Sequence, residues 1–126
     1  MVARRTVLTG AAAAGLLGAA AARAADPRAL YGLIGKFTAK PGQRLALAAA
    51  ILESGAMPGC LSYVVAEDTT APDDLWVTEV WESKAAHDAS LQLPAVRAAI
   101  AKARPLIAGY SAGSETRPLG GVGIGS

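Results

Sequence analysis

The sequence predicts an α+β fold built on one antiparallel sheet. After residue 24, segments of strand-like and helix-like composition follow one another as strand, helix, strand, strand, helix, strand. This order is the split βαβ arrangement of a ferredoxin-like fold, βαββαβ. We assign these segments to one domain over residues 25–116, which is enough chain for one small domain with one core.

The first half of this domain predicts a strand, a helix and a strand pair. Residues 30–39 are rich in β-forming side chains and contain no proline. Residues 43–54 carry apolar side chains at helical spacing, and Gly55 favours the end of that helix. Two further strands are predicted at 59–67 and 75–82, with a polar, Pro-containing loop between them.

The second half predicts a broken helix and a last strand. Ser83 is placed to cap the start of a helix that carries His87. Pro94 interrupts that helix, and a second helical segment is expected over 94–104, directly before another proline. A fourth strand is expected over 110–119, and residues 117–126 form a Gly-rich tail that we expect to be flexible.

Both faces of the strand at 75–82 are largely apolar. Side chains of a strand alternate between its two faces. One face holds Leu75, Val77, Glu79 and Trp81, and the other holds Trp76, Thr78, Val80 and Glu82. A lone two-layer domain would keep one sheet face polar, so we expect a homodimer joined across its sheets. A cavity between helices and sheet would use part of the same apolar surface.

The start of the chain has the layout of an export signal. Arg4 and Arg5 precede an apolar run over 7–22, which ends in Ala22-Arg23-Ala24 with small residues where a signal peptidase cleaves. The arginine pair predicts a twin-arginine signal over 1–24 and a periplasmic mature protein. The alternative is a membrane anchor, but the run is shorter than the ~20 apolar residues that a span needs.

Charge and cysteine content exclude several classes of function. Three of the twelve Lys and Arg lie in the signal and none of the ten acidic residues does, so nine bases face ten acids, a net charge of −1. A nucleic-acid partner is therefore not expected. With Cys60 as the lone cysteine and His87 as the lone histidine, neither a disulfide within the chain nor the usual His/Cys metal or haem site is expected.

The candidate catalytic residues are Glu79, Trp81 and His87. Glu79 and Trp81 point the same way from one strand, and His87 follows about one turn into the next helix. Imidazole titrates near neutral pH, which suits proton abstraction from a phenol. From the residues alone, His87 could equally be half-exposed or paired with Glu82 or Asp88, and Trp81 could be an ordinary core residue.

The stretch "DDLWVTEVWESKAAHDASLQLPAV" resembles the antibiotic biosynthesis monooxygenase family, particularly its quinol monooxygenase branch. These are small dimeric ferredoxin-like proteins of the dimeric α/β-barrel type. Their pattern of Glu-x-Trp at a strand end, then Ser and a helix with Ala and His, is matched in order by Glu79, Trp81, Ser83, Ala86 and His87. "GKFTAKPGQRLAL" and "PGCLSYVVAED" resemble the first strand-turn-helix and the second strand, so the likeness covers about residues 30–115.

The resemblance implies oxidation of a quinol- or anthrone-like aromatic by O2, without metal or flavin. It implies His87 as the base or anion partner, Trp81 as a stacking wall and Glu79 as an orienting group. The alternative is a non-catalytic dimeric module of the same fold that binds a small apolar molecule. Haem degradation is not expected, because relatives with that activity use an Asn and a His where this chain reads "GLIGKF" and "VRAAIAKA".

Overall fold

The computed structural model describes residues 29–124, apart from the side chain of Ala112. The predicted export signal, residues 1–24, lies outside this range. The elements in chain order are β1 (Tyr31–Ala39), α1 (Arg44–Leu52), β2 (Cys60–Glu67), β3 (Asp74–Trp81), α2 (Lys84–Ser90), α3 (Pro94–Ala103), the 3₁₀ turn η3 (Arg104–Leu106) and β4 (Ile107–Thr116). None of the helices in the described range is long and apolar enough to span a membrane.

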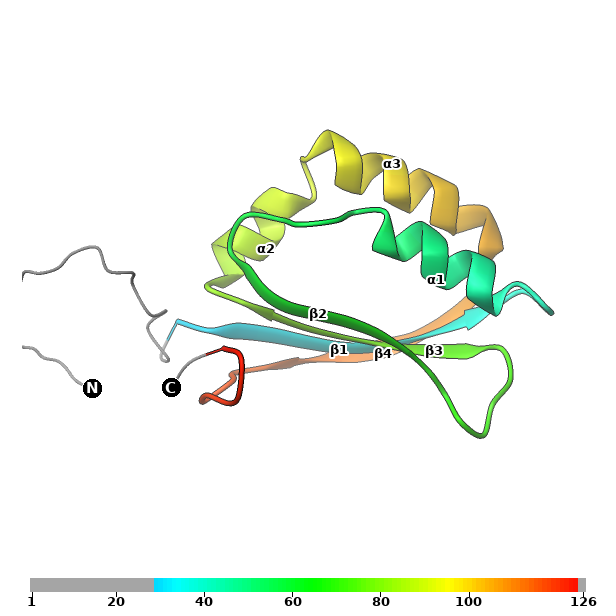
Figure 1. Cartoon of the computed structure of the whole chain (residues 1–126), viewed down its shortest axis with the longest axis horizontal. Coiled ribbons are helices and arrows are strands. Elements are labelled where there is room, and N and C mark those ends of the chain that lie inside the picture. Colours follow the sequence, from blue (N-terminus) through cyan, green and yellow to red (C-terminus); the bar gives the residue numbers. More distant parts are fainter. Residues whose placement is uncertain (1–28, 125–126) are drawn as a thin grey trace, which may run out of the picture.

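The four strands form one antiparallel sheet in the order β2-β3-β1-β4. α1, α2 and α3 lie on the same face of this sheet, and within residues 29–124 no helix covers the other face (Figure 1). The two connections β1-α1-β2 and β3-α2-α3-β4 each carry the chain over the helical face. The predicted ferredoxin-like α+β fold is confirmed.

Two local signals act where the sequence predicts them. Gly55 has φ +66°, a left-handed conformation that a glycine adopts without strain, and it follows the end of α1. Ser83 caps α2, because its Oγ accepts a hydrogen bond from the Ala86 amide at 3.0 Å.

The fourth strand begins and ends three residues earlier than the predicted range 110–119. The chain leaves η3 beside the end of β1, so Ile107 pairs at once with Ala39. Pairing ends at Thr116 opposite Gly32, near the start of β1, and the following Arg117 and Pro118 lie beyond β4. The pairing partner, and not the local composition, decides the bounds of this strand.

The core consists of two clusters on the helical face. Leu75, Val77 and Trp81 from β3 are 0%, 3% and 1% exposed, as the alternation of the strand predicts. The first cluster is Ala39, Leu47, Ala50, Ile51, Leu75, Val77 and Ala103. The second is Tyr31, Met57, Trp81 and Val96. The two clusters leave space between them, where the site described below lies.

The opposite face of the sheet exposes large apolar side chains. Ile34, Val64 and Trp76 are 40%, 50% and 39% exposed, and they come from three different strands. We call this surface, made of Ile34, Val64, Trp76 and the half-buried Val80, the outer sheet face. Lys36 lies over the Trp76 ring at 5.5 Å, and the Trp76 indole donates to Asp68 at 2.8 Å.

A hydrogen bond between Tyr31 and Glu115 ties the start of β1 to the end of β4. The Tyr31 hydroxyl donates to Glu115 Oε2 at 2.6 Å. Burial, and next the hydrogen bond with Glu115, raises the pKa of Tyr31 from 10.0 to about 12. Folding therefore favours the protonated phenol in the alkaline range.

We predict that this tyrosine makes stability fall at high pH. An unfolded tyrosine loses its proton near pH 10, whereas the folded Tyr31 keeps it to about pH 12. Its contribution to the free energy of unfolding is thus fully present below pH 10 and is lost as pH rises towards 12. Urea unfolding at pH 9, 10, 11 and 12 measures this, and Tyr31→Phe should fall less steeply than the wild type. Equal slopes would contradict the prediction.

Candidate active site

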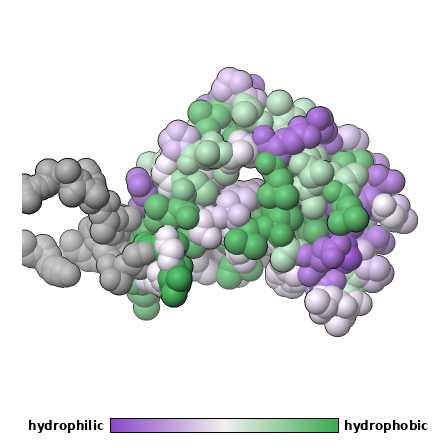
Figure 2. Space-filling view, in the orientation of Figure 1, coloured by the Kyte–Doolittle hydropathy of each residue, from purple (hydrophilic) through white to green (hydrophobic). Residues whose placement is uncertain are grey.

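A cavity of about 350 Å³ lies between the sheet and the helices, with contributions from both core clusters. The space-filling view shows a hollow in the molecule, bordered on one side by hydrophobic residues and elsewhere by more hydrophilic ones (Figure 2). Most of the wall is apolar, from Leu33, Phe37, Ile51, Met57, Val77, Leu91, Val96, Ala99, Ile100, Ala103 and Ile107. All three residues predicted from the sequence, Glu79, Trp81 and His87, also line it.

Glu79 places a half-buried carboxylate on the sheet side of the cavity. Alternation along β3 turns it towards the helices, between Val77 and Trp81. The Trp81 indole Nε1 donates a hydrogen bond to Glu79 Oε1 at 2.8 Å. The buried indole thereby fixes the direction of the carboxylate and supplies one of the hydrogen bonds that a carboxylate needs in apolar surroundings.

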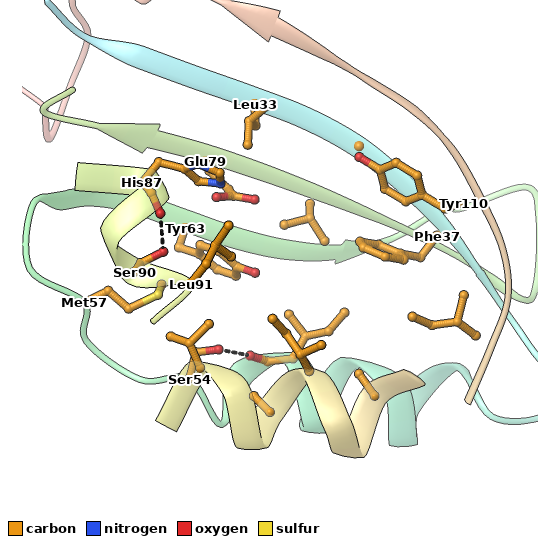
Figure 3. Close-up of a pocket in the computed structure, with 18 of the residues that line it drawn as sticks. Leu33, Phe37, Ser54, Met57, Tyr63, Glu79, His87, Ser90, Leu91 and Tyr110 are labelled. Carbon is orange, nitrogen blue, oxygen red and sulfur yellow. Dashed lines mark hydrogen bonds between the residues drawn. The ribbon is translucent and has the colours of Figure 1, made fainter. Parts of the chain in front are cut away.

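His87 lies at the same end of the cavity as Glu79 (Figure 3). Its ring packs against Tyr31, with ring centroids 5.3 Å apart, and edge-on against Trp81, with centroids 5.4 Å apart. The His87 side chain is 17% exposed. The cap at Ser83 begins the helix four residues earlier and so sets the place of this ring. His87 is therefore a wall residue of the cavity.

The pairing of His87 with Asp88, one of the alternatives that the sequence left open, is also present. His87 Nδ1 lies 3.0 Å from Asp88 Oδ1. The hydrogen bond with His87 lowers the pKa of Asp88, and the charge of Lys84 adds to this. Because an ionised Asp88 can only accept, Nδ1 is the donor of this bond, which leaves Nε2 as the ring nitrogen that could act as a base.

Tyr63 is a site residue that the sequence reasoning missed. It pairs with Glu79 across β2 and β3, so both side chains lie on the cavity side of the sheet. Burial raises the pKa of the Tyr63 phenol, and the Glu79 carboxylate adds to the rise. Tyr63 therefore stays protonated at neutral pH and can donate a hydrogen bond. Its alternation with Val65 along the strand is the signal that could have found it.

The two serines of the cavity are already engaged by the backbone. Ser90 Oγ donates to the His87 carbonyl at 2.6 Å, and Ser54 Oγ donates to the Ile51 carbonyl at 3.1 Å (Figure 3). The groups left to meet a ligand at this end are Glu79, His87 and Tyr63. We call these three residues the polar end of the cavity.

Cys60 is not suited to nucleophilic chemistry. Burial raises the pKa of its thiol, and its sulfur lies 3.6 Å from the Ser62 carbonyl oxygen. Within residues 29–124, no three His, Cys, Asp or Glu side chains gather as a metal site would require. The groups that line the cavity can transfer protons and form hydrogen bonds with a mainly apolar ligand.

Comparison with known proteins relates the chain to one family. The sequence profile of the family described as antibiotic biosynthesis monooxygenase matches residues 30–102. The comparison with curated proteins finds no match.

Solved structures share this fold. A protein of Chloroflexus aurantiacus J-10-fl, described provisionally as an antibiotic biosynthesis monooxygenase, is 59% identical, covers 76% of this chain and 99% of its own, and has a TM-score of 0.74. A similarly described protein of Caulobacter crescentus CB15 has 20% identity, coverage of 71% and 90%, and a TM-score of 0.65. Rv0793 of Mycobacterium tuberculosis has 24% identity, coverage of 74% and 98%, and a TM-score of 0.60. The last two show the fold alone. With the profile match over more than half of its length, this chain belongs to the antibiotic biosynthesis monooxygenase family.

Proposed function

We propose that this protein is a cofactor-independent monooxygenase that oxidises a quinol- or anthrone-like aromatic with O2. The observation that carries the proposal is the polar end of the cavity, where a ring nitrogen, a carboxylate and a protonated phenol line a mainly apolar wall. The other polar lining residues are Ser54 and Ser90, which the backbone engages, and Arg104 and Tyr110. Such a wall suits a flat aromatic ring, and the polar groups suit its hydroxyl or keto oxygen. The family membership supports the class of reaction.

In the proposed reaction, His87 Nε2 takes a proton from the substrate. The Tyr63 hydroxyl donates a hydrogen bond to the oxygen that becomes negative, and the fixed Glu79 carboxylate accepts one from a second hydroxyl. The electron-rich anion passes one electron to O2, and the two radicals combine into a carbon-bound peroxide anion, which takes the proton back from His87 to become a hydroperoxide. Loss of water then leaves the quinone, so one oxygen atom of O2 stays in the product and the other leaves as water. The protein binds the substrate, removes a proton from it and excludes bulk water from the cavity.

Trp81 has a supporting place in this scheme. With 1% exposure, its ring offers little surface for stacking, while its N–H holds Glu79 and its ring packs against His87. We therefore propose that Trp81 acts through its two neighbours as a positioning residue.

We predict oxygen uptake by the mature protein with a panel of naphthohydroquinols and anthrones. His87→Ala should lower kcat on the order of 100-fold, because general base catalysis typically contributes that much or more. Glu79→Gln and Tyr63→Phe should lower kcat as well. Glu82→Gln is the matched control, since Glu82 is exposed and does not line this cavity. An oxygen electrode gives the rates.

Three outcomes would decide against parts of this proposal. Uptake that is unchanged in His87→Ala rejects His87 as the base. Uptake that falls equally in Glu82→Gln rejects the polar end as the site. Binding of the aromatics with no uptake for any of them favours the non-catalytic binding module instead.

We also propose a homodimer joined across the outer sheet face. The support is the exposure of Ile34, Val64 and Trp76 on a face that no helix of the described part of the chain covers. An apolar surface spread over three strands is unfavourable in water. In a symmetric dimer, the outer sheet face of one copy would pack against the outer sheet face of the other.

We predict that light scattering will give twice the chain mass for the wild type. Val64→Glu places a charge in the proposed interface and should give a single-chain mass. The control is Leu45→Glu on α1, which is 70% exposed and lies on the helical side, and it should stay dimeric. A monomeric wild type, or a dimer that Leu45→Glu breaks and Val64→Glu does not, contradicts the interface.

We propose, finally, that the protein works after export by the twin-arginine route. The support is the arginine pair, the apolar run over 7–22 and the small residues before position 25.

We predict that the full chain, expressed in a bacterium with this route, reaches the periplasm with its N-terminus near Ala25. Changing Arg4 and Arg5 together to Lys should keep it inside the cell, because the route requires the arginine pair. Arg28→Lys, outside the signal, should have no effect. Fractionation and N-terminal sequencing give the answer, and an uncleaved cytoplasmic wild type would reject export.

A further inference from the structure

The cavity has a second end that differs from the polar end. Phe37 and Tyr110 lie there, away from His87 and Glu79, as the close-up shows (Figure 3). Tyr110, on β4, lines the cavity and is nevertheless 56% exposed. Its ring therefore stands between the cavity and the solvent.

The Tyr110 ring is held in this place by packing. It pairs in register with Phe37 of β1, and the two ring centroids are 4.7 Å apart at 54°. Its hydroxyl makes no hydrogen bond to a side chain or backbone group among residues 29–124. A change of rotamer of Tyr110 would therefore break the contact with Phe37 but no hydrogen bond to these residues.

Two glycines make room for the Tyr110 hydroxyl. A Cβ built on Gly35 would lie 2.7 Å from this oxygen, and one built on Gly113 would lie 2.8 Å from it. Gly35 is on the cavity side of β1, opposite Val77, and the register of β1 and β4 shifts next to it, between Ile34 and Lys36. With any side chain at position 35, the ring could not lie where it does.

We propose that Tyr110, whose hydroxyl packs against Gly35, limits the length of the aromatic ligand that the cavity accepts. A volume of about 350 Å³ is near the lower end of the ~300–1,000 Å³ of small-molecule sites, which suits one or two fused rings with the Tyr110 ring in place. A third ring that starts at the polar end has to displace Tyr110. The inference rests on the proposed function only in taking the ligand as a flat aromatic.

The test uses two unreactive, neutral ring probes of different length, naphthalene-2-methanol and anthracene-2-methanol, with calorimetric titration; their hydroxyl group can donate to Glu79 or His87 and accept from Tyr63. The wild type should bind the two-ring probe more tightly. Tyr110→Ala should shift the ratio of the two affinities towards the three-ring probe on the order of tenfold, since a hydrophobic pocket discriminates by about that much per small group. Tyr110→Phe keeps the ring and should leave the ratio unchanged.

Gly35→Ala tests the contact between position 35 and the Tyr110 ring without removing the ring. The atom that its methyl group meets is the far end of the Tyr110 side chain, which can move away, so this variant should fold. Gly35→Ala should shift the ratio of the two probe affinities in the same direction as Tyr110→Ala does. In a protein that already carries Tyr110→Ala, adding Gly35→Ala should change this ratio little. Gly113→Ala is unsuitable, because its Cβ would also lie 2.5 Å from the Ile34 carbonyl oxygen, a backbone atom.

Each result supports or overturns the inference. An unchanged ratio in Tyr110→Ala overturns it, as does a Tyr110→Phe that behaves like Tyr110→Ala. Full additivity of Gly35→Ala and Tyr110→Ala overturns the role of Gly35. Leu45→Ala, an exposed truncation outside the cavity, is the control and should leave the ratio unchanged. Circular dichroism checks the fold of each variant. Because the probes are not oxidised, a failed oxygen-uptake assay leaves this test intact.

Discussion

The hydrogen bond from Trp81 to Glu79 is the interaction on which the site depends. A carboxylate facing an apolar cavity loses hydration, and it needs a donor in return. The donor here is a side chain of the core: Trp81 is almost fully buried in the second cluster and meets Glu79 at 2.8 Å. The same indole packs edge-on against His87. The core thus orients two polar groups from two different elements.

The cavity exists because the core is divided. One cluster gathers residues of α1 with the middle of the sheet, and the other gathers Trp81, Tyr31, Met57 and Val96. Close packing between them would stabilise the fold further, since unfilled space loses contacts between atoms. The wall that results combines a dry surface with the polar end, which is the combination that binding and deprotonating an aromatic ring requires.

The sheet serves a different purpose on each side. Its inner face carries Glu79 and Tyr63 beside buried residues, whereas its outer face exposes Ile34, Val64 and Trp76. Strand alternation alone separates the two sets, because neighbouring side chains point in opposite directions. In the dimer proposed above, a change on the outer face would alter assembly without touching the cavity, and a change in the cavity would leave the outer face intact.

The sequence by itself determined the order of elements, the cap at Ser83 and the side of β3 that Glu79 and Trp81 share, because these follow from local periodicity and short-range hydrogen bonds. It did not determine where β4 begins, that Tyr63 faces Glu79, or that His87 lines the cavity while bonding Asp88. Each of these depends on which strand or helix lies opposite, so it is decided by contacts between residues far apart in the chain. Tertiary structure alone set them.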